Sequence, residues 1–293
     1  MTENSCDKGE FIKTGLIMEG GAMRGLFTAG VIDVFMENNI TFDGAIGVSA
    51  GAAFGCNYKS GQIGRAIRYN KKYSKDKRYC SLRSLIRTGD LYGADFCYRE
   101  LPEKLDVFDK EAFNNNPMEF YVVCTDIVTG KPVYHKIDLA ENDYLEWIRA
   151  SASLPLASRV VEVGGHKLLD GGISDSIPLE YFQSIGYLKN VVILTQPIDY
   201  VKKKNKLIPL IRRVFKNYPM LVKAMEERHN VYNKTVEYIC EMERQGKIFV
   251  VRPERALPVK RVERDAEKLQ NVYDIGREIA HKKLDEIKEF LQK

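Results

Sequence analysis

The 293-residue sequence predicts an α/β fold of three layers, in which helices cover both faces of a mostly parallel central sheet. A strand–helix–strand pattern occupies residues 14–48, and strands alternate with helices as far as about residue 198. From residue 199 onward the pattern becomes largely helical. We therefore expect a polar N-terminal segment at 1–13, an α/β domain at 14–198 and a basic, mainly helical C-terminal region at 199–293.

The first strand–helix–strand unit is defined by four consecutive patterns. The apolar stretch TGLIME predicts a buried strand at 14–19, and the glycine-rich GGAMRG predicts a turn at 20–25. Residues 26–39 have apolar side chains at helical spacing and end at a pair of asparagines, which predicts a helix. FDGAIGV at 42–48 predicts the next strand. The two strands should be parallel neighbours joined by a right-handed crossover.

The remaining elements follow from the same patterns of period and turn residues. We expect mostly helix over 61–115, a strand–turn–strand unit at 120–137, a helix at 143–155 that ends near its proline, a hairpin within 159–172 and a buried strand at 190–197. The hairpin turns at a Gly-Gly pair, and Asp170 begins the loop that follows it.

Composition limits the class of protein. An apolar content of 44% and a charged content of 29% are those of an ordinary globular protein. The first residues lack the basic start and apolar stretch of a secretory signal, and no apolar run approaches the roughly 20 residues that span a bilayer. Six scattered cysteines without metal-ligand spacing favour reduced thiols, a cytoplasmic location and no metal.

One serine lies where a strand turns sharply into a helix. In GVSAG, Ser49 is flanked by Gly47 and Gly51 and follows the strand at 42–48. A strand–GxSxG–helix sequence is the nucleophile elbow of acyl hydrolases, whose tight turn leaves room only for small neighbouring side chains. The alternative is a small-residue turn that carries a capping or solvent-facing serine.

The glycine-rich turn at 20–25 precedes a helix one unit earlier. Such a turn directs several backbone N–H groups into one space, where they bind a phosphate or stabilise an oxyanion. A dinucleotide site is disfavoured because Ala22 interrupts the glycine pattern and no suitable acidic residue follows at the required distance. No GK[ST] follows to hold a triphosphate. Two adjacent loops, one nucleophilic and one rich in N–H donors, fit acyl hydrolysis better.

The sequence offers few bases for such a serine. Among the four histidines, only His166 lies near a motif, and a structural or surface role remains open for each. Asp170 ends an apolar stretch and is followed by Gly171 and Gly172, which let a carboxylate approach another loop closely. An ordinary Asp-Gly turn is the alternative for Asp170.

The motifs EGGAMRG, GVSAG and DGG, in this order, resemble those of the patatin-like phospholipases, especially bacterial members. ASASLP at 150–155 and TDIVTG at 125–130 are also similar to that family. The resemblance covers about residues 14–198. It implies a patatin-like fold and a lipid acyl hydrolase that needs no cofactor, metal or nucleotide.

The resemblance also implies roles for individual residues. Ser49 would be the nucleophile and Asp170 its base, without a histidine. The oxyanion loop would comprise Gly20, Gly21, Ala22, Met23, Arg24 and Gly25. Ala22 departs from the third glycine of many relatives and restricts the backbone there. Because a free aspartate is a weak base, we expect Asp170 to be shielded from solvent, to have a raised pKa and to lie within hydrogen-bond reach of Ser49 Oγ.

Alternatives remain open at this stage. One is a Ser–His esterase or acyltransferase that uses His166, and another is a non-catalytic module that binds lipid or phosphate. Arg24 could bind a lipid phosphate or form a salt bridge that fixes the loop. Glu19 and Asp126 are interpreted as structural residues, Asp126 at a turn.

The charge of the C-terminal region suggests a partner. Residues 1–198 carry 22 Lys and Arg against 25 Asp and Glu, whereas residues 199–293 carry 23 against 15. Seven basic residues and no acidic one occur within 201–216, interleaved with apolar residues. This segment either contacts an anionic membrane surface peripherally or packs its apolar side on the domain with its lysines in water. No nucleic-acid motif is present, and the sequence does not predict an oligomeric state.

Overall fold

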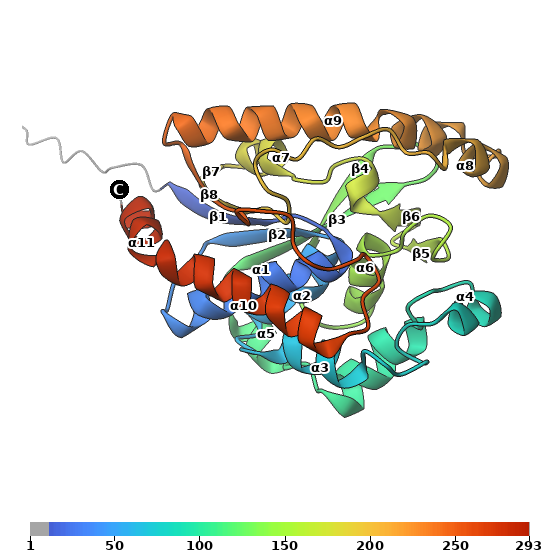
Figure 1. The fold of residues 1–293 in the computed structure, drawn as a ribbon, viewed down its shortest axis with the longest axis horizontal. Helices are drawn as coiled ribbons and strands as arrows, with labels where there is room; N and C mark the ends of the chain where they lie inside the picture. Colours follow the sequence, from blue (N-terminus) through green and yellow to red (C-terminus); the bar gives the residue numbers. More distant parts are fainter. Residues whose placement is uncertain (1–11, 293) are drawn as a thin grey trace, which may run out of the picture.

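The computed structural model describes residues 12–292 and has three layers around one central sheet (Figure 1). Helices α7 and α9 cover one face of the sheet, and α1, α2, α3 and α10 lie on the other. The predicted three-layer α/β fold with a mostly parallel sheet is therefore confirmed. Of the predicted polar segment at 1–13, residues 1–11 lie outside the described residues.

The strands and helices have the following bounds. The strands are β1 Lys13–Met18, β2 Gly44–Val48, β3 Glu119–Asp126, β4 Pro132–Ile137, β5 Val161–Val163, β6 His166–Asp170, β7 Tyr187–Ile193 and β8 Ile248–Val251. The α-helices are α1 Gly25–Glu37, α2 Ala50–Lys59, α3 Arg65–Tyr73, α4 Leu82–Thr88, α5 Lys110–Asn115, α6 Tyr144–Ser151, α7 Leu179–Ser184, α8 Ile208–Val214, α9 Pro219–Arg244, α10 Ala266–Lys282 and α11 Leu284–Gln292. Three other short helices are η1 Ala22–Arg24, η2 Phe96–Leu105 and η3 Gly171–Ile173.

The sheet has the strand order β5-β6-β3-β2-β1-β7-β8, with β4 paired to β3. Strands β3, β2, β1, β7 and β8 are mutually parallel, whereas β4, β5 and β6 form antiparallel pairs. The predicted parallel pairing of the first two strands and both predicted antiparallel units are present. The carboxyl ends of β1 and β2 lie side by side at one edge of the sheet, where ligands bind in open α/β folds.

Alternate residues of β1 show how the sequence builds two cores. Leu16 and Met18 belong to the apolar cluster under α1 and α10, and Ile17 belongs to the cluster under α7 and α9. All three side chains are fully buried. A strand that is apolar on both faces must be covered on both faces, which accounts for the continuous apolar run of TGLIME.

The C-terminal helix α10 packs on α1 with almost no space between the two backbones. A Cβ at Gly276 would lie 2.2 Å from the carbonyl oxygen of Phe27, and a Cβ at Gly30 would lie 2.1 Å from that of Tyr273. Asp33 on α1 accepts a 2.6 Å hydrogen bond from the Tyr273 hydroxyl. Burial raises the pKa of Asp33 to about 6, although this hydrogen bond opposes the rise.

The region from residue 199 is mainly helical, as the sequence predicts, but it also completes the sheet. Strand β8 lies parallel to β7 at the edge of the sheet, and α9 lies across one face (Figure 1). The apolar run IFVV of β8 is only four residues long, which is too short to distinguish from a helical segment by period alone. The predicted boundary at residue 198 stays a prediction.

The helix predicted over residues 143–155 is shorter in the structure. Helix α6 ends at Ser151, four residues before the proline. The residue before a proline disfavours helical backbone, so the helix stops early and its last residues form a turn instead. The end of α6 places Ser151, and the turn after it places Ser153, beside the candidate site described below.

Replacing Gly276 with alanine should destabilise the protein by about 1–3 kcal/mol, because the added methyl group collides with the backbone of α1. Urea unfolding measures this change in the free energy of unfolding. Asn271→Ala is the matched control, since Asn271 is exposed on the same helix and should change stability by less than about 0.5 kcal/mol. Equal stability of Gly276→Ala and wild type would contradict the close packing of α1 and α10.

Candidate active site

Ser49 lies on a strained turn between β2 and α2. Its backbone has φ 56° and ψ −119°, a conformation that residues other than glycine rarely adopt. The flanking glycines make the turn possible: a Cβ at Gly47 would lie 2.5 Å from the carbonyl oxygen of Gly51, and a Cβ at Gly51 would lie 2.3 Å from that of Met18. The predicted sharp turn is therefore present, with small residues at both flanking positions.

A second serine fixes the backbone of this turn. The Ser49 N–H donates a 2.9 Å hydrogen bond to Ser151 Oγ, whose hydroxyl donates a 2.6 Å bond to the carbonyl oxygen of Val123. Both serines are buried. Ser151 belongs to the ASASLP stretch that the sequence analysis found family-like, and the structure shows what it contacts.

The glycine-rich loop packs directly against Ser49. A Cβ at Gly20 would lie 2.9 Å from Ser49 Cβ, and one at Gly25 would lie 2.7 Å from Ala50 Cβ. A Cβ at Gly21 would lie 2.7 Å from Thr195 Oγ1. Met23 is buried beneath the loop, and the loop leads through η1 into α1. Its first N–H groups therefore lie at a helix start, where they have no acceptor within the helix.

Ala22 has a left-handed backbone with φ 49°. Glycine adopts this conformation freely, whereas the Cβ of alanine disfavours it. From the sequence, alanine was expected to restrict the backbone at this position. The structure shows that the loop keeps the left-handed turn despite that restriction, so the packing around the loop must offset the strain.

Glu19 anchors the start of the loop from inside the protein. One carboxylate oxygen accepts hydrogen bonds from the N–H and hydroxyl of Thr195, at 2.6 and 3.1 Å. The other accepts a 2.8 Å bond from the Tyr232 hydroxyl on α9. The Thr195 hydroxyl also lies 3.1 Å from the carbonyl oxygen of Gly20. These contacts support the structural interpretation of Glu19 and tie the loop to α9.

Strand β3 brings Asp170 next to the Ser49 turn. Val48 at the end of β2 pairs with Val123, and Asp170 at the end of β6 pairs with the next residue, Cys124. Asp170 is only 2% exposed. Its Oδ1 accepts a 2.8 Å hydrogen bond from the Gly172 N–H, while its Oδ2 is buried without a hydrogen-bond partner among residues 12–292.

The electrostatic environment of Asp170 matches the expectation from sequence. Burial raises the pKa of its carboxyl group, and Arg228, the Ser49 hydroxyl and the Gly172 N–H oppose that rise. The Ser49 hydroxyl is thus near enough to affect the carboxylate, although the pair does not form a hydrogen bond of 3.5 Å or less.

The two glycines after Asp170 let the backbone of this loop lie close to β3 on one side and to Arg228 on the other. A Cβ at Gly171 would lie 2.1 Å from the carbonyl oxygen of Val123, and one at Gly172 would lie 3.0 Å from both Asp170 Oδ1 and Arg228 Nη2. Larger residues here would push the carboxylate away from β3 or from the guanidinium group.

Three histidines have partners away from Ser49. His166 Nδ1 lies 2.9 Å from Asp126 Oδ2 at the start of β6, about 13 Å along the strand from Asp170. His135 stacks on Trp147, and His229 Nδ1 lies 2.9 Å from the Glu226 carbonyl oxygen. None of the four histidines is among the residues of 12–292 that line a cavity together with Ser49.

Asp126 forms the turn that the sequence analysis assigned to it. Its Oδ1 accepts hydrogen bonds from the N–H groups of Val128 and Thr129, at 2.8 and 2.9 Å. His166 is the largest of the groups that hold the pKa of Asp126 below its ordinary value against the effect of its burial. The Asp126–His166 contact therefore holds the turn between β3 and β4 against the β5–β6 hairpin.

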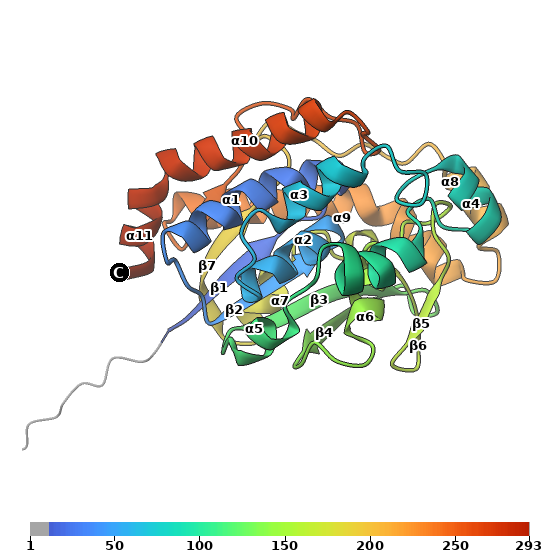
Figure 2. The same cartoon turned by 90° about the horizontal axis from the view of Figure 1, so that it is seen from below.

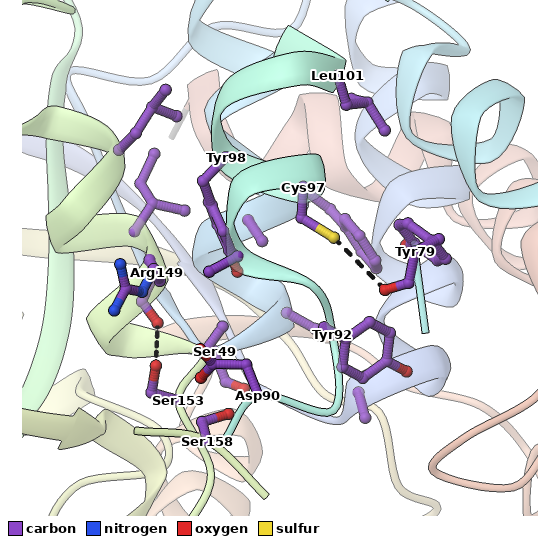
Figure 3. Close-up of a pocket in the computed structure, with 18 of the residues that line it drawn as sticks. Ser49, Tyr79, Asp90, Tyr92, Cys97, Tyr98, Leu101, Arg149, Ser153 and Ser158 are labelled. Carbon is purple, nitrogen blue, oxygen red and sulfur yellow. Dashed lines mark hydrogen bonds between the residues drawn. The ribbon is translucent and has the colours of Figure 1, made fainter. Parts of the chain in front are cut away.

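Ser49 lines a mostly apolar cavity on the side away from Asp170. Aromatic and aliphatic side chains of α2, η2 and α6 line it, among them Phe54, Tyr98, Leu101 and Ile148. Figure 3 shows Ser49 in this cavity together with Tyr92, Tyr98 and Leu101, which come from the η2 segment and the loop before it. The arrangement suits an apolar chain whose end lies at the serine.

A smaller cavity on the other side contains Ser49, Asp170 and four cations. Arg24, Lys202, Arg228 and Arg261 line it together with Glu19 and the glycine-rich loop. The sequence motifs point to Arg24 but not to the other three. The basic run at 201–216 signals one of them, whereas nothing local to Arg228 or Arg261 marks them, because their position depends on how α9 and the 252–264 loop pack on the domain.

Two general features of the described residues bear on function. Within residues 12–292, no group of three or more His, Cys, Asp and Glu side chains is arranged to hold a metal ion. Over the same span, no helix is both long and apolar enough to cross a membrane.

Comparison with known proteins assigns the family. The sequence profile of the patatin-like phospholipases matches residues 16–182, more than half of the chain. The chain belongs to the patatin-like phospholipase family. In this patatin-like protein the matched segment contains Ser49, the glycine-rich loop and Asp170. A second profile, a domain of unknown function (DUF6363), matches residues 218–292, which include α9, β8 and α10.

Several curated proteins are similar to this patatin-like chain. The Escherichia coli protein named "Uncharacterized protein YjjU" is 32% identical over 195 residues, which cover 63% of this chain and 52% of that protein. "Uncharacterized NTE family protein Rv1063c" of Mycobacterium tuberculosis is 27% identical over 170 residues, 57% of this chain and 44% of that protein. "Lysophospholipase nte1" of Aspergillus fumigatus is 26% identical over 179 residues, 59% of this chain and 11% of that protein. The match spans about half or less of each relative's length.

Among solved structures, VipD from Legionella pneumophila is similar with a TM-score of 0.48 and 12% sequence identity. The similarity covers 94% of this chain and 67% of that chain.

Replacing Ala22 with glycine should stabilise the protein by roughly 0.5–1 kcal/mol, because the left-handed backbone then carries no Cβ. Thermal or urea unfolding measures the change. Ala224→Gly on α9 is the matched control and should destabilise by about 1 kcal/mol, the usual cost of glycine inside a helix. If Ala22→Gly destabilised the protein as much as the control, residue 22 would not be strained.

Proposed function

We propose that this protein is a serine acyl hydrolase that cleaves carboxylic esters of lipids through a Ser49–Asp170 dyad and an acyl-enzyme intermediate. The observation that carries the proposal is the buried Asp170 carboxylate, which has one unpartnered oxygen and adjoins the strained turn that presents the Ser49 hydroxyl. Membership of the patatin-like phospholipase family supports lipid ester hydrolysis at the level of the family.

In the first half-reaction, Ser49 Oγ attacks the ester carbonyl carbon as its proton moves to Asp170. The tetrahedral intermediate then collapses, the leaving alcohol takes that proton, and the acyl group stays on Ser49. In the second half-reaction, water gives a proton to Asp170 and attacks the acyl carbon. The released fatty acid leaves Ser49 Oγ, which recovers its proton from Asp170.

The raised pKa of Asp170 makes it a better base than an exposed aspartate. Proton transfer is most effective when the pKa of the base approaches the working pH. Burial between β3 and the Ser49 turn moves the pKa of the carboxyl group in that direction, and the charges of Arg228 and Lys202 oppose part of that rise.

The glycine-rich loop, Gly20 to Gly25, is proposed to stabilise the oxyanion. Its backbone is adjacent to Ser49 Cβ, and its N–H groups lie at the start of the η1–α1 helix. Such donors favour the negative charge that develops on the carbonyl oxygen, and losing one typically costs on the order of 100-fold in rate. Ser49 N–H is not available for this role because Ser151 accepts its hydrogen bond.

The apolar cavity supports a substrate with a fatty acyl chain. The curated relative from Aspergillus fumigatus carries the name lysophospholipase, and the same class of ester is proposed for this chain. Neither a metal nor a cofactor takes part in the proposed steps.

The Ser–His alternative has little geometric support. His166 is bound to Asp126 at the far end of β6, and His135 and His229 are engaged elsewhere. A non-catalytic lipid- or phosphate-binding module would not need an unpartnered buried carboxylate beside a strained serine.

Substituting the dyad should abolish ester cleavage. Ser49→Ala and Asp170→Asn should each lower kcat for a p-nitrophenyl ester by at least about 1,000-fold, whereas His166→Ala should change it by less than threefold. Spectrophotometric turnover measures this, with unfolding curves as a check that each variant is folded. Loss of activity in His166→Ala together with retention in Asp170→Asn would favour the Ser–His alternative.

We also propose that the protein acts on a membrane surface from the cytoplasm. No residue of α4 is buried, and its Leu82 and Ile86 are 72% and 85% exposed beside the exposed Arg83 and Arg87. Helices α4 and α8 lie at the same end of the molecule in Figures 1 and 2. Exposed apolar and basic side chains together favour anionic lipid surfaces.

The basic segment 201–216 was expected either to contact a membrane or to pack on the domain, and helix α8 within it has features of both. Ile208 and Ile211 pack into the apolar cluster beneath the helix. Leu210 and Val214 remain about half exposed, next to the exposed Arg212 and Arg213. The segment therefore packs on the domain and still presents apolar and basic groups outward. The loop after α4, beginning at Asp90, lines the apolar cavity of Ser49, so this end of the molecule adjoins the cavity.

Introducing a charge on this surface should weaken membrane binding. Ile86→Glu should lower the affinity for phosphatidylglycerol vesicles on the order of tenfold, because it removes apolar contact and adds repulsion. Vesicle co-sedimentation measures the affinity. Leu188→Glu is the control, since Leu188 is 58% exposed at the start of β7, away from α4 and α8. Equal effects of the two substitutions would contradict the proposed surface.

A further inference from the structure

A strongly basic chamber adjoins the Ser49–Asp170 pair, and the proposed reaction does not require it. Residues 197–206, helix α9 and the loop around residues 254–261 line this open chamber of about 680 Å³. Seven basic side chains line it against two acidic ones: Lys202, Lys203, Lys204, Lys206, Arg228, Arg255 and Arg261 against Asp199 and Glu254.

The chamber is continuous with the active site through three cations. Lys202, Arg228 and Arg261 line both the chamber and the small cavity that contains Ser49 and Asp170. Arg261 also lines the apolar cavity. An ester held at Ser49 would therefore have its acyl chain on one side and the basic chamber on the other.

Two of the guanidinium groups at this junction have unmet hydrogen-bonding capacity. The Nε atoms of Arg24 and Arg228 are buried, and neither has a hydrogen-bond partner among residues 12–292. Burial lowers the pKa of Arg228, and the charge of Asp170 only partly opposes this effect. A buried Nε–H group without an acceptor is costly, so an anion that accepts hydrogen bonds from these groups would be favoured.

Lys202 is held in place at the same junction. The backbone N–H of Lys202 donates a 2.9 Å hydrogen bond to Asn233 Oδ1. The side-chain Nδ2 of Asn233 donates a 3.1 Å hydrogen bond to the backbone carbonyl oxygen of Lys202. Its Nζ lies 3.9 Å from the centre of the Tyr232 ring. Burial and the nearby Arg228 lower the pKa of Lys202 to about 7. An added negative charge would raise this pKa and so favour the protonated form of Lys202.

The acidic groups nearby do not neutralise this cluster. Glu19 already accepts hydrogen bonds from Thr195 and Tyr232. Even so, only two carboxylates, Glu19 and Asp170, line the small cavity against four cations, and neither Asp199 nor Glu254 lines it. The junction therefore retains an excess of positive charge beside the nucleophile.

We propose that the chamber binds the phosphate headgroup of the substrate, so that the preferred substrate is a lipid ester with a terminal phosphate monoester. Such a group carries close to two negative charges and accepts bidentate hydrogen bonds from arginine. A phosphocholine headgroup would instead add a quaternary ammonium cation to a basic chamber. This substrate preference rests on the proposed hydrolase function, whereas the phosphate site itself does not.

The site is tested first by binding, in a Ser49→Ala protein that cannot turn the ligand over. Calorimetry compares monomeric 1-octanoylglycerol 3-phosphate, 1-octanoylglycerol, octanoylglycerophosphocholine and inorganic phosphate. We expect the phosphate monoester to bind at least about tenfold more tightly than each of the others. Adding Arg228→Met or Lys202→Met should remove that preference, whereas Lys234→Met, an exposed charge on α9 that lines none of the cavities, should leave it intact.

Several binding outcomes would overturn the inference. Equal affinity for the phosphate monoester and the neutral ester would exclude the headgroup site. Equal affinity for inorganic phosphate and the lipid phosphate would make this a site for free phosphate. Retention of the preference in both Arg228→Met and Lys202→Met would place phosphate recognition elsewhere.

Turnover separates this inference from the proposed function. Wild type should cleave the phosphate monoester with at least a tenfold higher kcat/KM than the neutral ester, and Arg228→Met should lose that ratio. If Arg228→Met lowered both activities equally, Arg228 would act only through its effect on the pKa of Asp170. The proposed preference for a phosphate monoester would then be wrong. If wild type cleaved neither ester while the binding preference held, the hydrolase proposal would fail and the phosphate site would stand.

Discussion

The arrangement of the candidate site depends on one strand. Consecutive residues of β3, Val123 and Cys124, pair with the last residues of β2 and β6, and this register sets the Ser49 turn beside Asp170. Val123 also accepts the Ser151 hydrogen bond that fixes the turn, and its carbonyl oxygen leaves room only for glycine at residue 171. A slip of one residue in the pairing of β6 would turn Asp170 to the other face of the sheet.

Burial and strain at this site are offset by the surrounding structure. The positive φ of Ser49 and Ala22 and the buried Asp170 charge each cost stability. The two covering layers offset these costs, and much of that cover comes from the C-terminal region, through α9 on one face and α10 on the other. The C-terminal region is thus part of the fold around the site, and it also supplies Lys202, Arg228 and Arg261.

The sequence predicted the local parts of this arrangement well. Continuous apolar runs and a period-3.6 pattern placed the first strand–helix–strand unit, and steric demands on glycine marked both turns. The dyad residues were named from motifs that resemble a known family, and their catalytic roles remain proposals. Long-range features were missed: β8 is too short to recognise alone, and the approach of Arg228 to Gly172 depends on how a distant helix packs. The shortened α6 reflects the tertiary role of Ser151 and the proline beyond it.

The most direct test of the central claim is the pH dependence of the rate at which an organophosphonate modifies Ser49. Deprotonated Asp170 is the reactive form, so the rate should rise with pH through one ionisation whose pKa lies above the ordinary aspartate value of 3.8. That ionisation should persist in His166→Ala and disappear in Asp170→Asn. An ionisation near the ordinary histidine value of about 6.5, lost on substitution of a histidine and retained in Asp170→Asn, would contradict the account.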